Sequence, residues 1–495
     1  MSRIIIQNGN MCELDLPLKF AQKLYNEFAI RHPNAFYLRT RQRGMQNWDG
    51  KIHYITKTGQ FKIGLLPKVY DMCIEMGIKP KVVDMRQPLP KVSKVVTNIG
   101  KYKLRPEQEK AVKAVINNKI GNTPFHIGVL DYTVNAGKTL IMSSLYLSYK
   151  KQLKTLLITN DSDWLNQARE EFKQYLPGED ITFVQGKVLN WSNFTIGMVQ
   201  SISRNMRFYQ KELSQIDMVL IDEADQGGSK QYQNVITRLF NTRIRIGLSG
   251  TIYMSKLAKD RVKNMNLECF FGKVIAEFKL KDSIKKGYST KTVVKMVPGK
   301  PWYGNWESDC ISYKEIYDDS ITNCYTAWLM AYSRLRWNIN QGRYPALVVC
   351  KHIAHCENLY KFFKKKLGDA YNIAYVHVNT PSKLRQQIMK DFREGKIDIL
   401  VSTTIIARGK NFPKLRYLLN AASMDSQEKS IQFLGRLVRT DKSKKKVYLD
   451  DLHYPGPYLD RHGKHRKQYY QRQELKVILL DKLWKKHPNH SLIKS

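Results

Sequence analysis

The segment D-Y-T-V-N-A-G-K-T-L, from Asp131 to Leu140, is the most informative part of this chain. It follows an apolar run, His126 to Leu130, that has the composition of a buried strand, and it leads into Ile141 to Tyr149, whose pattern predicts a helix. A strand, a loop and a helix in this order, with G-K-T where the helix begins, are typical of a loop that binds nucleotide phosphates.

The G-K-T ending contains the groups that ATP and Mg²⁺ need. Backbone N–H groups would hold phosphate oxygens, the Lys138 ammonium would lie beside the β- and γ-phosphates, and the Thr139 hydroxyl would bind Mg²⁺. The full pattern G-x-x-x-x-G-K-[ST] begins with a glycine where this chain has Tyr132. Judged from the loop alone, the alternative is that G-K-T occurs here by chance and binds no nucleotide. The predicted ATP-binding residues of the loop are Asn135, Ala136, Gly137, Lys138 and Thr139.

The composition indicates a folded chain with a polyanionic partner. The 495 residues include 83 Lys and Arg against 43 Asp and Glu, a formal net charge of +40, and the length predicts roughly three domains. Nucleic acid is the leading partner for such a charge, and a basic surface without a specific role is the alternative. No apolar run approaches the ~18 residues of a membrane span, and no signal peptide is recognisable, so we expect a cytoplasmic protein without a membrane partner.

Seven cysteines without a C-x-x-C pair predict free thiols in a reducing compartment. One cluster, Cys350, His352, His355 and Cys356, has the residue types of a zinc site. Its spacing crosses a predicted strand end and helix start, so we expect the four side chains to point in different directions.

Residues 1–92 are expected to form a small α+β nucleic-acid-binding domain, with a helix from Leu18 to Phe28 and a turn at Asn47–Gly50. Within it, Tyr37 to Gly44 places an arginine at every second position. On a strand these arginines would share one face suited to a phosphate backbone, and a charged, solvated edge strand is the equal alternative. The arginines are Arg39, Arg41 and Arg43.

From the phosphate loop onward, predicted strands and helices alternate, which indicates parallel sheets with helices on both faces and ligands at the carboxyl ends of the strands. Met218 to Ile221 runs into D-E-A-D, where Asp222 would hold Mg²⁺ and Glu223 would orient and deprotonate the attacking water. Ile244 to Leu248 leads into S-G-T, whose Ser249 and Thr251 hydroxyls would hydrogen-bond the acidic pair and a neighbouring domain.

Before the loop, Gln108 lies on a predicted helix from Glu107 to Asn117. Its amide can donate and accept, as reading an adenine edge demands, and a surface glutamine is the alternative.

The second half repeats the alternation without a second G-K-[ST], so we interpret it as a partner for the first nucleotide site. Its last helical segment, Gln432 to Thr440, reads Q-F-L-G-R-L-V-R-T. On one helix, Gln432, Arg436 and Arg439 would share a face, and arginines can neutralise charge on a transferring phosphoryl group. A basic helix surface is the alternative.

Gln108, G-K-T, D-E-A-D, S-G-T and Q-x-x-G-R-x-x-R occur here in one order across about 330 residues. This ordered set closely resembles superfamily-two helicases, which carry two RecA-like domains around one ATP. The resemblance also covers strand-gripping segments in both domains, which contact phosphates rather than bases. The residues that it implies as nucleic-acid contacts are Gln200, Ser201, Thr403, Thr404 and Arg408.

N-W-D-G-K-I, followed by F-K-I-G-L-L-P, is similar to the small N-terminal domain of UvsW-type helicases from tailed bacteriophages. The resemblance implies an enzyme that uses ATP to migrate DNA junctions, reverse stalled forks and strip R-loops in phage recombination and repair, in the host cytoplasm. The sequence leaves the oligomeric state open, with a monomer favoured. At position 411 this chain has Asn, where many members of the family have an acidic residue. The tail from Arg461 to Ser495, which includes Tyr469 and Tyr470, has no family motif. For this tail, added DNA contacts and a solvated helix are equal hypotheses.

The expected fold class is therefore α/β, with two tandem RecA-like parallel-sheet domains after a small α+β domain. The expected bounds are 1–92, 93–284 for the ATP-binding domain, 285–460 for the arginine-bearing domain, and 461–495 for a basic tail. Two other functions remain open: an RNA-remodelling helicase, because D-E-A-D also occurs in RNA enzymes, and an ATP-independent strand-annealing protein with a vestigial nucleotide site.

Overall fold

The computed structural model describes residues 2–41, 44–149, 152–186, 188–252, 260–299, 312–407, 412–441 and 443–480. The chain divides into two compact units, Met1–Phe278 and Lys279–Ser495. Within the described residues, none of the helices combines the length and the apolar character needed to cross a lipid bilayer.

The first unit contains an eight-stranded sheet in the order β14-β13-β15-β12-β16-β17-β11-β18, which is parallel except for the β13–β14 pair. Its central strands are buried on both faces and therefore have mainly apolar sequences, with Arg245 of β17 as a charged exception. The strands are β11 (Ile127–Tyr132), β12 (Thr155–Thr159), β13 (Ile181–Gln185), β14 (Val188–Leu189), β15 (Phe194–Met198), β16 (Met218–Asp222), β17 (Ile244–Ser249) and β18 (Val274–Phe278).

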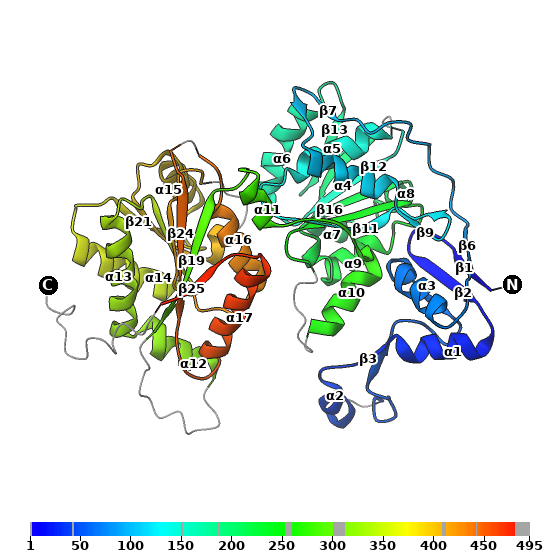
Figure 1. Ribbon diagram of the computed structural model, residues 1–495, viewed down its shortest axis with the longest axis horizontal. Coiled ribbons are helices and arrows are strands. Elements are labelled where there is room, and N and C mark those ends of the chain that lie inside the picture. The colour runs from blue at the N-terminus through cyan, green and yellow to red at the C-terminus, as the bar shows by residue number, and fades with distance from the viewer. Residues whose placement is uncertain are drawn as a thin grey trace. The chain divides into compact units, whose positions relative to one another are not determined.

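Helices connect these strands and cover the sheet (Figure 1). The expected helix at 107–117 is confirmed as α4 and the helix after the phosphate loop as α5, in both cases within a few residues of the predicted start. The helices of this sheet are α4 (Pro106–Ile116), α5 (Lys138–Ser148), α6 (Ser162–Tyr175), α7 (Val199–Arg204), α8 (Gln210–Ser214), α9 (Lys230–Ile236) and α10 (Arg261–Phe271). Two short hairpins flank α4: β7 (Asn98–Ile99) with β8 (Tyr102–Lys103), and β9 (Lys119–Ile120) with β10 (Thr123–Pro124).

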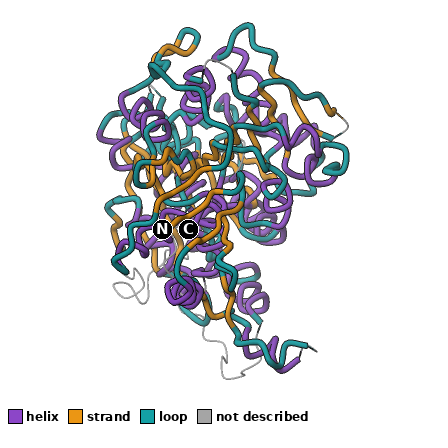
Figure 2. Tube along the Cα trace, turned by 90° about the vertical axis from the view of Figure 1, so that its right-hand side faces the viewer, coloured by secondary structure: helices purple, strands orange, loops and turns teal. Residues whose placement is uncertain are grey.

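The N-terminal region has an α+β fold of its own, as expected. Its four-stranded sheet has the order β5-β2-β1-β6, and its helices pack beside that sheet (Figure 2). The elements are β1 (Arg3–Ile6), β2 (Met11–Asp15), α1 (Leu18–Glu27), β5 (Gln60–Lys62), α3 (Leu66–Glu75) and β6 (Lys81–Asp84).

The N-terminal region shares one hydrophobic core with the large sheet of the first unit. A single cluster runs from Ile4 and Leu66 to Ile221 and Phe271. The fully buried Arg245 of β17 reinforces this junction, because its Nη2 donates to the Gly9 carbonyl oxygen at 2.6 Å and to Asn10 Oδ1 at 2.8 Å. Burial lowers the pKa of Arg245 to about 9. The region is therefore built into the first unit by shared packing.

A hairpin of β3 (Ala29–Arg31) and β4 (Lys51–His53) carries a short helix, α2 (Ala35–Arg41). The strand predicted for the arginine-rich segment is therefore wrong. Two residues apart on a helix, Arg39 and Arg41 point about 200° apart rather than along one face. Arg43 lies outside the described residues.

The second unit contains a seven-stranded, all-parallel sheet in the order β21-β22-β20-β23-β24-β19-β25. The expected fold class, two RecA-like parallel-sheet domains after a small α+β region, is confirmed. The strands are β19 (Lys291–Pro298), β20 (Ala346–Cys350), β21 (Ile373–Val376), β22 (Ile399–Thr403), β23 (Tyr417–Asn420), β24 (Lys446–His453) and β25 (Val477–Leu479). The helices are α11 (Leu280–Lys285), α12 (Tyr313–Tyr317), α13 (Tyr325–Asn340), α14 (Ile353–Leu367), α15 (Ser382–Glu394), α16 (Gln427–Leu437) and α17 (Leu459–Arg472).

Residues 461–480, which we expected to belong to a separate basic tail, are part of the second unit. They form most of α17 and all of β25, an edge strand that pairs with β19. Tyr469 and Tyr470 are 5% and 1% exposed. The solvated-helix hypothesis is therefore wrong for α17, and its two tyrosines are buried away from any DNA strand. DNA contacts by the basic residues of this segment stay a prediction.

Candidate active site

The predicted site residues of the first unit lie along one edge of its sheet. In the strand order β15-β12-β16-β17-β11, all neighbouring strands are parallel, so their carboxyl ends are adjacent. Asp222 ends β16, Ser249 ends β17, and the phosphate loop follows β11. This arrangement brings the loop, the acidic segment and S-G-T together.

The phosphate loop has a backbone that only small or special residues tolerate. Asn135 has φ 64° and Gly137, directly before α5, has φ 72° and ψ 48°. A Cβ atom on Gly137 would lie 2.3 Å from Gln108 Nε2. Glycine is therefore required here both by the left-handed backbone and by the space.

Gln108 and Arg105 hold this loop from the start of α4. Gln108 is fully buried: its Nε2 donates to the Ala136 carbonyl oxygen at 2.8 Å, and its Oε1 accepts from the Arg105 backbone N–H at 2.8 Å. Arg105 Nη2 donates to the Asn135 carbonyl oxygen at 3.1 Å. The donor and acceptor that we assigned to adenine are thus paired with protein groups. Arg105 was missed by the sequence reasoning, although R-P-E-Q marks a helix start at this point.

The structure at Tyr132 explains why the first glycine of the pattern G-x-x-x-x-G-K-[ST] is not needed in this chain. It is the last residue of β11 and is fully buried, and its hydroxyl donates to the Glu107 carbonyl oxygen at 2.8 Å. The position belongs to the strand rather than to the loop, so no unusual backbone conformation is needed there.

Lys138 and Asp222 form the charged centre of the site. Lys138 Nζ lies 4.0 Å from Asp222 Oδ1, an oxygen that is buried without a hydrogen-bond partner. Burial raises the pKa of the Asp222 carboxyl above its ordinary value, and the Lys138 ammonium partly opposes this. A buried carboxylate oxygen left open in this way is suited to a divalent cation, and Mg²⁺ typically takes one or two carboxylates plus substrate phosphates. The residues present therefore fit the Mg²⁺ that we expected with ATP.

Glu223 and the S-G-T segment surround this centre. Glu223 has a left-handed backbone (φ 53°), and its Oε2 accepts a hydrogen bond from Gln226 Nε2 at 3.2 Å. Ser249 Oγ donates to Asp225 Oδ1 at 2.7 Å and lies 3.1 Å from Thr251 Oγ1. Ser249 thus contacts the last acid of D-E-A-D, rather than the Asp222–Glu223 pair that we predicted.

The predicted strand-gripping residues occupy the ends of further strands in each unit. In the first unit, Gln200 Nε2 donates to the Asn160 carbonyl oxygen at 3.4 Å, and Ser201 Oγ accepts from the Gly186 N–H at 3.0 Å, both at the start of α7. In the second unit, Thr403 ends β22, and Thr404 Oγ1 accepts from Lys429 Nζ at 3.2 Å. Arg408 lies outside the described residues.

Helix α16 carries two of the three residues predicted for phosphoryl-group stabilisation. Gln432 and Arg436 lie one turn apart on it, but the helix ends at Leu437, so the prediction that Arg439 shares their helical face is wrong. The backbone of Arg439 is fixed instead by Thr290, the residue before β19, because Thr290 Oγ1 donates to the Arg439 carbonyl oxygen at 3.1 Å. The buried Lys444 ammonium donates to the Leu437 carbonyl oxygen at 3.1 Å and so holds the end of α16.

The cysteine and histidine cluster of the second unit is built into the core. Cys350 and Cys356 are fully buried, and His355 Nδ1 lies 3.1 Å from the Tyr317 hydroxyl oxygen. Burial raises the pKa of the Cys350 thiol and lowers that of His355 to about 3. In the part of the chain that the structure describes, no group of three or more His, Cys, Asp or Glu side chains is arranged to hold a metal ion.

Helix α2 and its hairpin line a basic groove of about 520 Å³ in the N-terminal region. Arg31, Arg39 and Lys51 contribute cationic side chains and Asp49 an anionic one. Beside them, Phe36 is 80% exposed. A groove with cations and an exposed aromatic ring has the chemistry of a nucleic-acid contact.

Two family profiles match the chain. They are described as "Type III restriction enzyme, res subunit", over residues 101–254, and "Helicase conserved C-terminal domain", over residues 331–441. A fragment structure of a putative HsdR subunit of a type I restriction enzyme from Vibrio vulnificus covers 76% of this chain and 68% of its own, with a TM-score of 0.55 at 15% identity, which shows a common fold.

Relatives among the curated proteins match most of the chain at low identity. Putative helicase 22 of Sulfolobus islandicus filamentous virus is 23% identical over 385 residues, covering 71% of this chain, which in turn spans only 64% of that relative. The ATP-dependent DNA helicase uvsW of Enterobacteria phage T4 is 22% identical over 452 residues, covering 82% of each chain. The ordered motifs, the two profiles and the fold show that this chain belongs to the superfamily-two helicases and is homologous to the uvsW helicase of phage T4.

Proposed function

We propose that the chain is an ATP-dependent DNA helicase or translocase that remodels branched DNA, by junction migration, fork reversal and R-loop removal, in phage recombination and repair. The observation that carries the ATP-dependent part is the Lys138–Asp222 centre. The buried Asp222 Oδ1 has no hydrogen-bond partner and lies 4.0 Å from Lys138 Nζ. Lys138 is the first residue of α5, directly after the phosphate loop.

Each residue of this centre has a role in ATP hydrolysis. The backbone of Asn135 to Gly137 and the Lys138 ammonium bind the phosphates, and Glu223 orients the attacking water and accepts its proton. Thr139 and Asp222 would hold Mg²⁺, which supplies positive charge against the developing negative charge of the phosphoryl group. Gln108 supports the loop through Ala136 and contacts the adenine edge when ATP is bound, for which its amide exchanges a protein partner for the base.

Residues of the second unit complete the proposed reaction. Arg436 and Arg439 neutralise charge on the transferring phosphoryl group, a role in which arginine fingers contribute about 10³ to 10⁵ in rate, and Gln432 helps to position the reacting groups. Ser249 and Thr251 relay the state of the acidic segment through Asp225 and so couple hydrolysis to movement.

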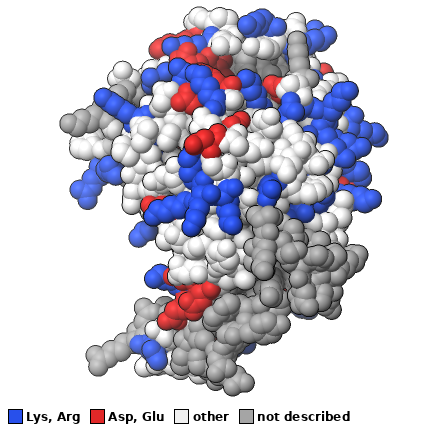
Figure 3. Space-filling model, turned by 90° about the vertical axis from the view of Figure 1, so that its left-hand side faces the viewer, with Lys and Arg blue, Asp and Glu red and all other residues white. Residues whose placement is uncertain are grey.

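The proposed DNA contacts are mainly to phosphates, which position a strand without reading its sequence. The net charge of +40 supports such a partner, and Figure 3 shows Lys and Arg side chains gathered in patches on one face of the molecule. The proposed contact residues are Gln200, Ser201, Thr403, Thr404 and Arg408 in the two units, with Arg39, Arg41 and Arg43 in the N-terminal region.

A panel of substrates tests this function. The parent and Lys138→Ala are assayed for strand separation on forked DNA, a four-way junction, linear duplex DNA and structured RNA, with and without ATP. We expect ATP-dependent activity on the branched DNA substrates and loss of at least about 10²-fold in Lys138→Ala, because the ammonium is the main fixed charge at the phosphates.

The same panel separates the two alternatives. Preference for RNA, in both binding and stimulated ATP hydrolysis, would identify an RNA-remodelling helicase. Strand annealing that survives in Lys138→Ala would identify an ATP-independent strand-annealing protein and contradict the proposal.

A further inference from the structure

Helix α17 lies beyond the matched helicase profile, which ends at residue 441, and it packs against α16 within the second unit. We propose that α17 is a positioning element that fixes the orientation of α16 and thereby of Gln432 and Arg436. This inference rests on the proposed role of α16 in ATP hydrolysis. The contact involves the loop Ala421–Asp425, which joins β23 to α16 and which we call the α16 lead-in loop.

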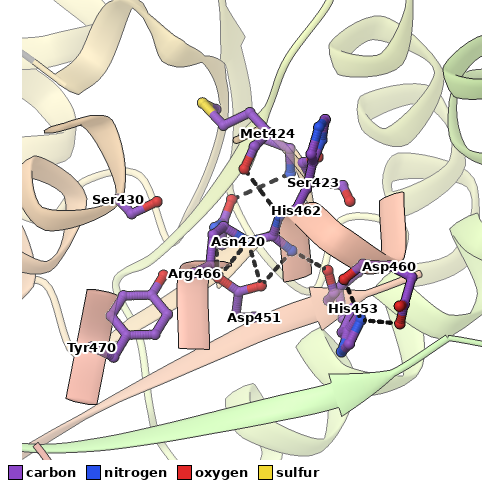
Figure 4. A network of polar contacts seen from close by, with 12 residues as sticks. Asn420, Ser423, Met424, Ser430, Asp451, His453, Asp460, His462, Arg466 and Tyr470 are labelled. Atoms are coloured by element: carbon purple, nitrogen blue, oxygen red, sulfur yellow. Dashed lines mark hydrogen bonds and ion pairs between the residues drawn. The ribbon is translucent and has the colours of Figure 1, made fainter. Parts of the chain in front are cut away.

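One face of α17 contacts three consecutive residues of the lead-in loop, of which Figure 4 shows Ser423 and Met424. His462 Nδ1 lies 3.3 Å from the Ser423 carbonyl oxygen, and Arg466 Nη1 donates to the Met424 carbonyl oxygen at 3.0 Å. At Asp425 Oδ1, His465 Nδ1 lies 2.9 Å away, and the Tyr469 hydroxyl donates at 3.1 Å. The four α17 residues are His462, His465, Arg466 and Tyr469.

This spacing is i, i+3, i+4 and i+7, which places all four side chains on one helical stripe. In most surface helices such a stripe is apolar and faces the core. Here it is polar, and it faces backbone carbonyls and a carboxylate of one loop. The stripe therefore fixes the course of the loop through directional bonds.

A buried charge pair anchors the stripe to the sheet. Arg466 and Asp451 of β24 are both fully buried, with Arg466 Nη2 lying 2.9 Å from Asp451 Oδ1. The Tyr470 hydroxyl and Asn420 Nδ2 donate to Asp451 Oδ2 at 2.7 and 2.8 Å. Because an unpaired buried charge is costly, this network holds α17 in one position, and Arg466 extends that position to the lead-in loop.

The lead-in loop needs such support because its backbone is strained. Ser423 has φ 42°, in the left-handed region that residues other than glycine rarely adopt. Two residues after Asp425, α16 begins at Gln427, with the Ser426 hydroxyl accepting from the Lys429 N–H. A relaxed lead-in loop would therefore shift the start of α16, and with it the side chains of Gln432 and Arg436.

The test uses variants that loosen the loop but leave the buried Arg466–Asp451 pair intact. Tyr469→Phe and His465→Ala, singly and together, remove the contacts that these two α17 side chains make with Asp425. Tyr417→Phe is the matched control, because it removes one tyrosine hydroxyl bond to a buried aspartate of the same sheet, Asp450 at 3.1 Å, and that bond involves no residue of α17.

We expect the double variant to lose about 10-fold in kcat for DNA-stimulated ATP hydrolysis, because small displacements of positioned groups are costly, while KM for ATP and Kd for DNA stay within about 2-fold. Amide hydrogen exchange of residues 421–426 should accelerate in the α17 variants and not in the control. A kcat equal to that of Tyr417→Phe, or unchanged exchange in the loop, would overturn the inference.

A double-mutant cycle with Asp425→Asn adds a second readout. If α17 acts through Asp425, Tyr469→Phe should lower kcat much less in the Asp425→Asn background than in the parent, whereas fully additive losses would contradict the inference. Tyr469→Phe alone serves if the double variant does not fold. Hydrogen exchange requires no ATP turnover, so loss of ATP-dependent activity in the parent would refute the proposed function without deciding this test.

Discussion

Gly137 is the residue on which the conformation of the phosphate loop depends most directly. We predict that Gly137→Ala weakens ATP binding by about 2 kcal/mol or more, about 30-fold in Kd. Alanine is strained at φ 72°, and its Cβ would displace the buried Gln108 Nε2 from Ala136. Binding of a fluorescent ATP analogue measures the effect.

Gly178→Ala is the matched control for this variant. Its φ is 80°, so it has a similar backbone cost, but no atom lies within 4 Å of the added Cβ. We expect nearly parental ATP affinity in Gly178→Ala. Equal losses in the two variants would show that contact with Gln108 has no part in shaping the loop.

His355 gives the second unit a pH-dependent stability. Burial lowers its pKa to about 3 from an ordinary value of 6.5, so the unfolded chain binds more protons between these two values. Stability therefore rises with pH across that window and is lost as pH falls below 6.5, with a slope of at most about 1.4 kcal/mol per pH unit.

His355→Gln removes this titration and keeps a polar partner for the Tyr317 hydroxyl. We predict that the free energy of unfolding falls less in this variant than in the parent between about pH 7 and pH 4, by about 1 to 3 kcal/mol. Urea unfolding at several pH values measures it. If the free energy of unfolding of the parent and of His355→Gln changed equally with pH, His355 would not be the source of this pH dependence.

Helices and strands can be predicted from the sequence where their own residues carry the pattern of apolar and polar side chains. The predicted strands Met218–Ile221 and Ile244–Leu248 are confirmed as β16 and β17 to within one residue, because buried parallel strands have mainly apolar sequences. The arginine-rich segment was misassigned because its alternation suggests a strand, whereas Asn34, a residue type favoured at helix starts, directly precedes α2.

The contacts of the site were harder to predict, because they depend on tertiary structure. Gln108 was singled out, but its bond to Ala136 depends on how α4 meets the loop. In α17 the buried face carries His462, Arg466 and Tyr469, and a face with such polar residues resembles a solvated helix in the sequence. The spacing of these polar residues was the available signal.

The junction between the N-terminal region and the large sheet makes another prediction at this scale. A Cβ atom on Gly64 would lie 2.0 Å from the Glu268 carbonyl oxygen of α10. We expect Gly64→Ala to lower the free energy of unfolding by about 2 to 3 kcal/mol, since backbone atoms cannot move aside cheaply.

Gly228→Ala is the control at the same helix, because its Cβ would meet only the side chain of Leu267, at 3.7 Å from Cδ2 and 3.9 Å from Cγ, which is ordinary van der Waals contact. Urea unfolding should show a change of about 0.5 kcal/mol or less in this control. A Gly64→Ala variant as stable as Gly228→Ala would show that the N-terminal region is not packed onto α10 in this way.

At the scale of the whole molecule, the charge of +40 predicts strongly salt-dependent DNA binding. If six to ten phosphates are neutralised, affinity for duplex DNA should fall by about 10³ to 10⁵ between 50 and 200 mM salt, with a slope of about −0.9 per phosphate. Fluorescence anisotropy across a salt series measures this slope. A flat dependence would exclude phosphate contacts as the main source of affinity.

We propose that residues of both units serve one ATP hydrolysis reaction. The most direct measurement is kcat for DNA-stimulated ATP hydrolysis in Arg439→Ala, together with its Kd for DNA. We predict a loss of about 10³-fold or more in kcat with unchanged DNA affinity, because an arginine finger acts on the transferring phosphoryl group. Near-parental turnover in Arg439→Ala would contradict the claim.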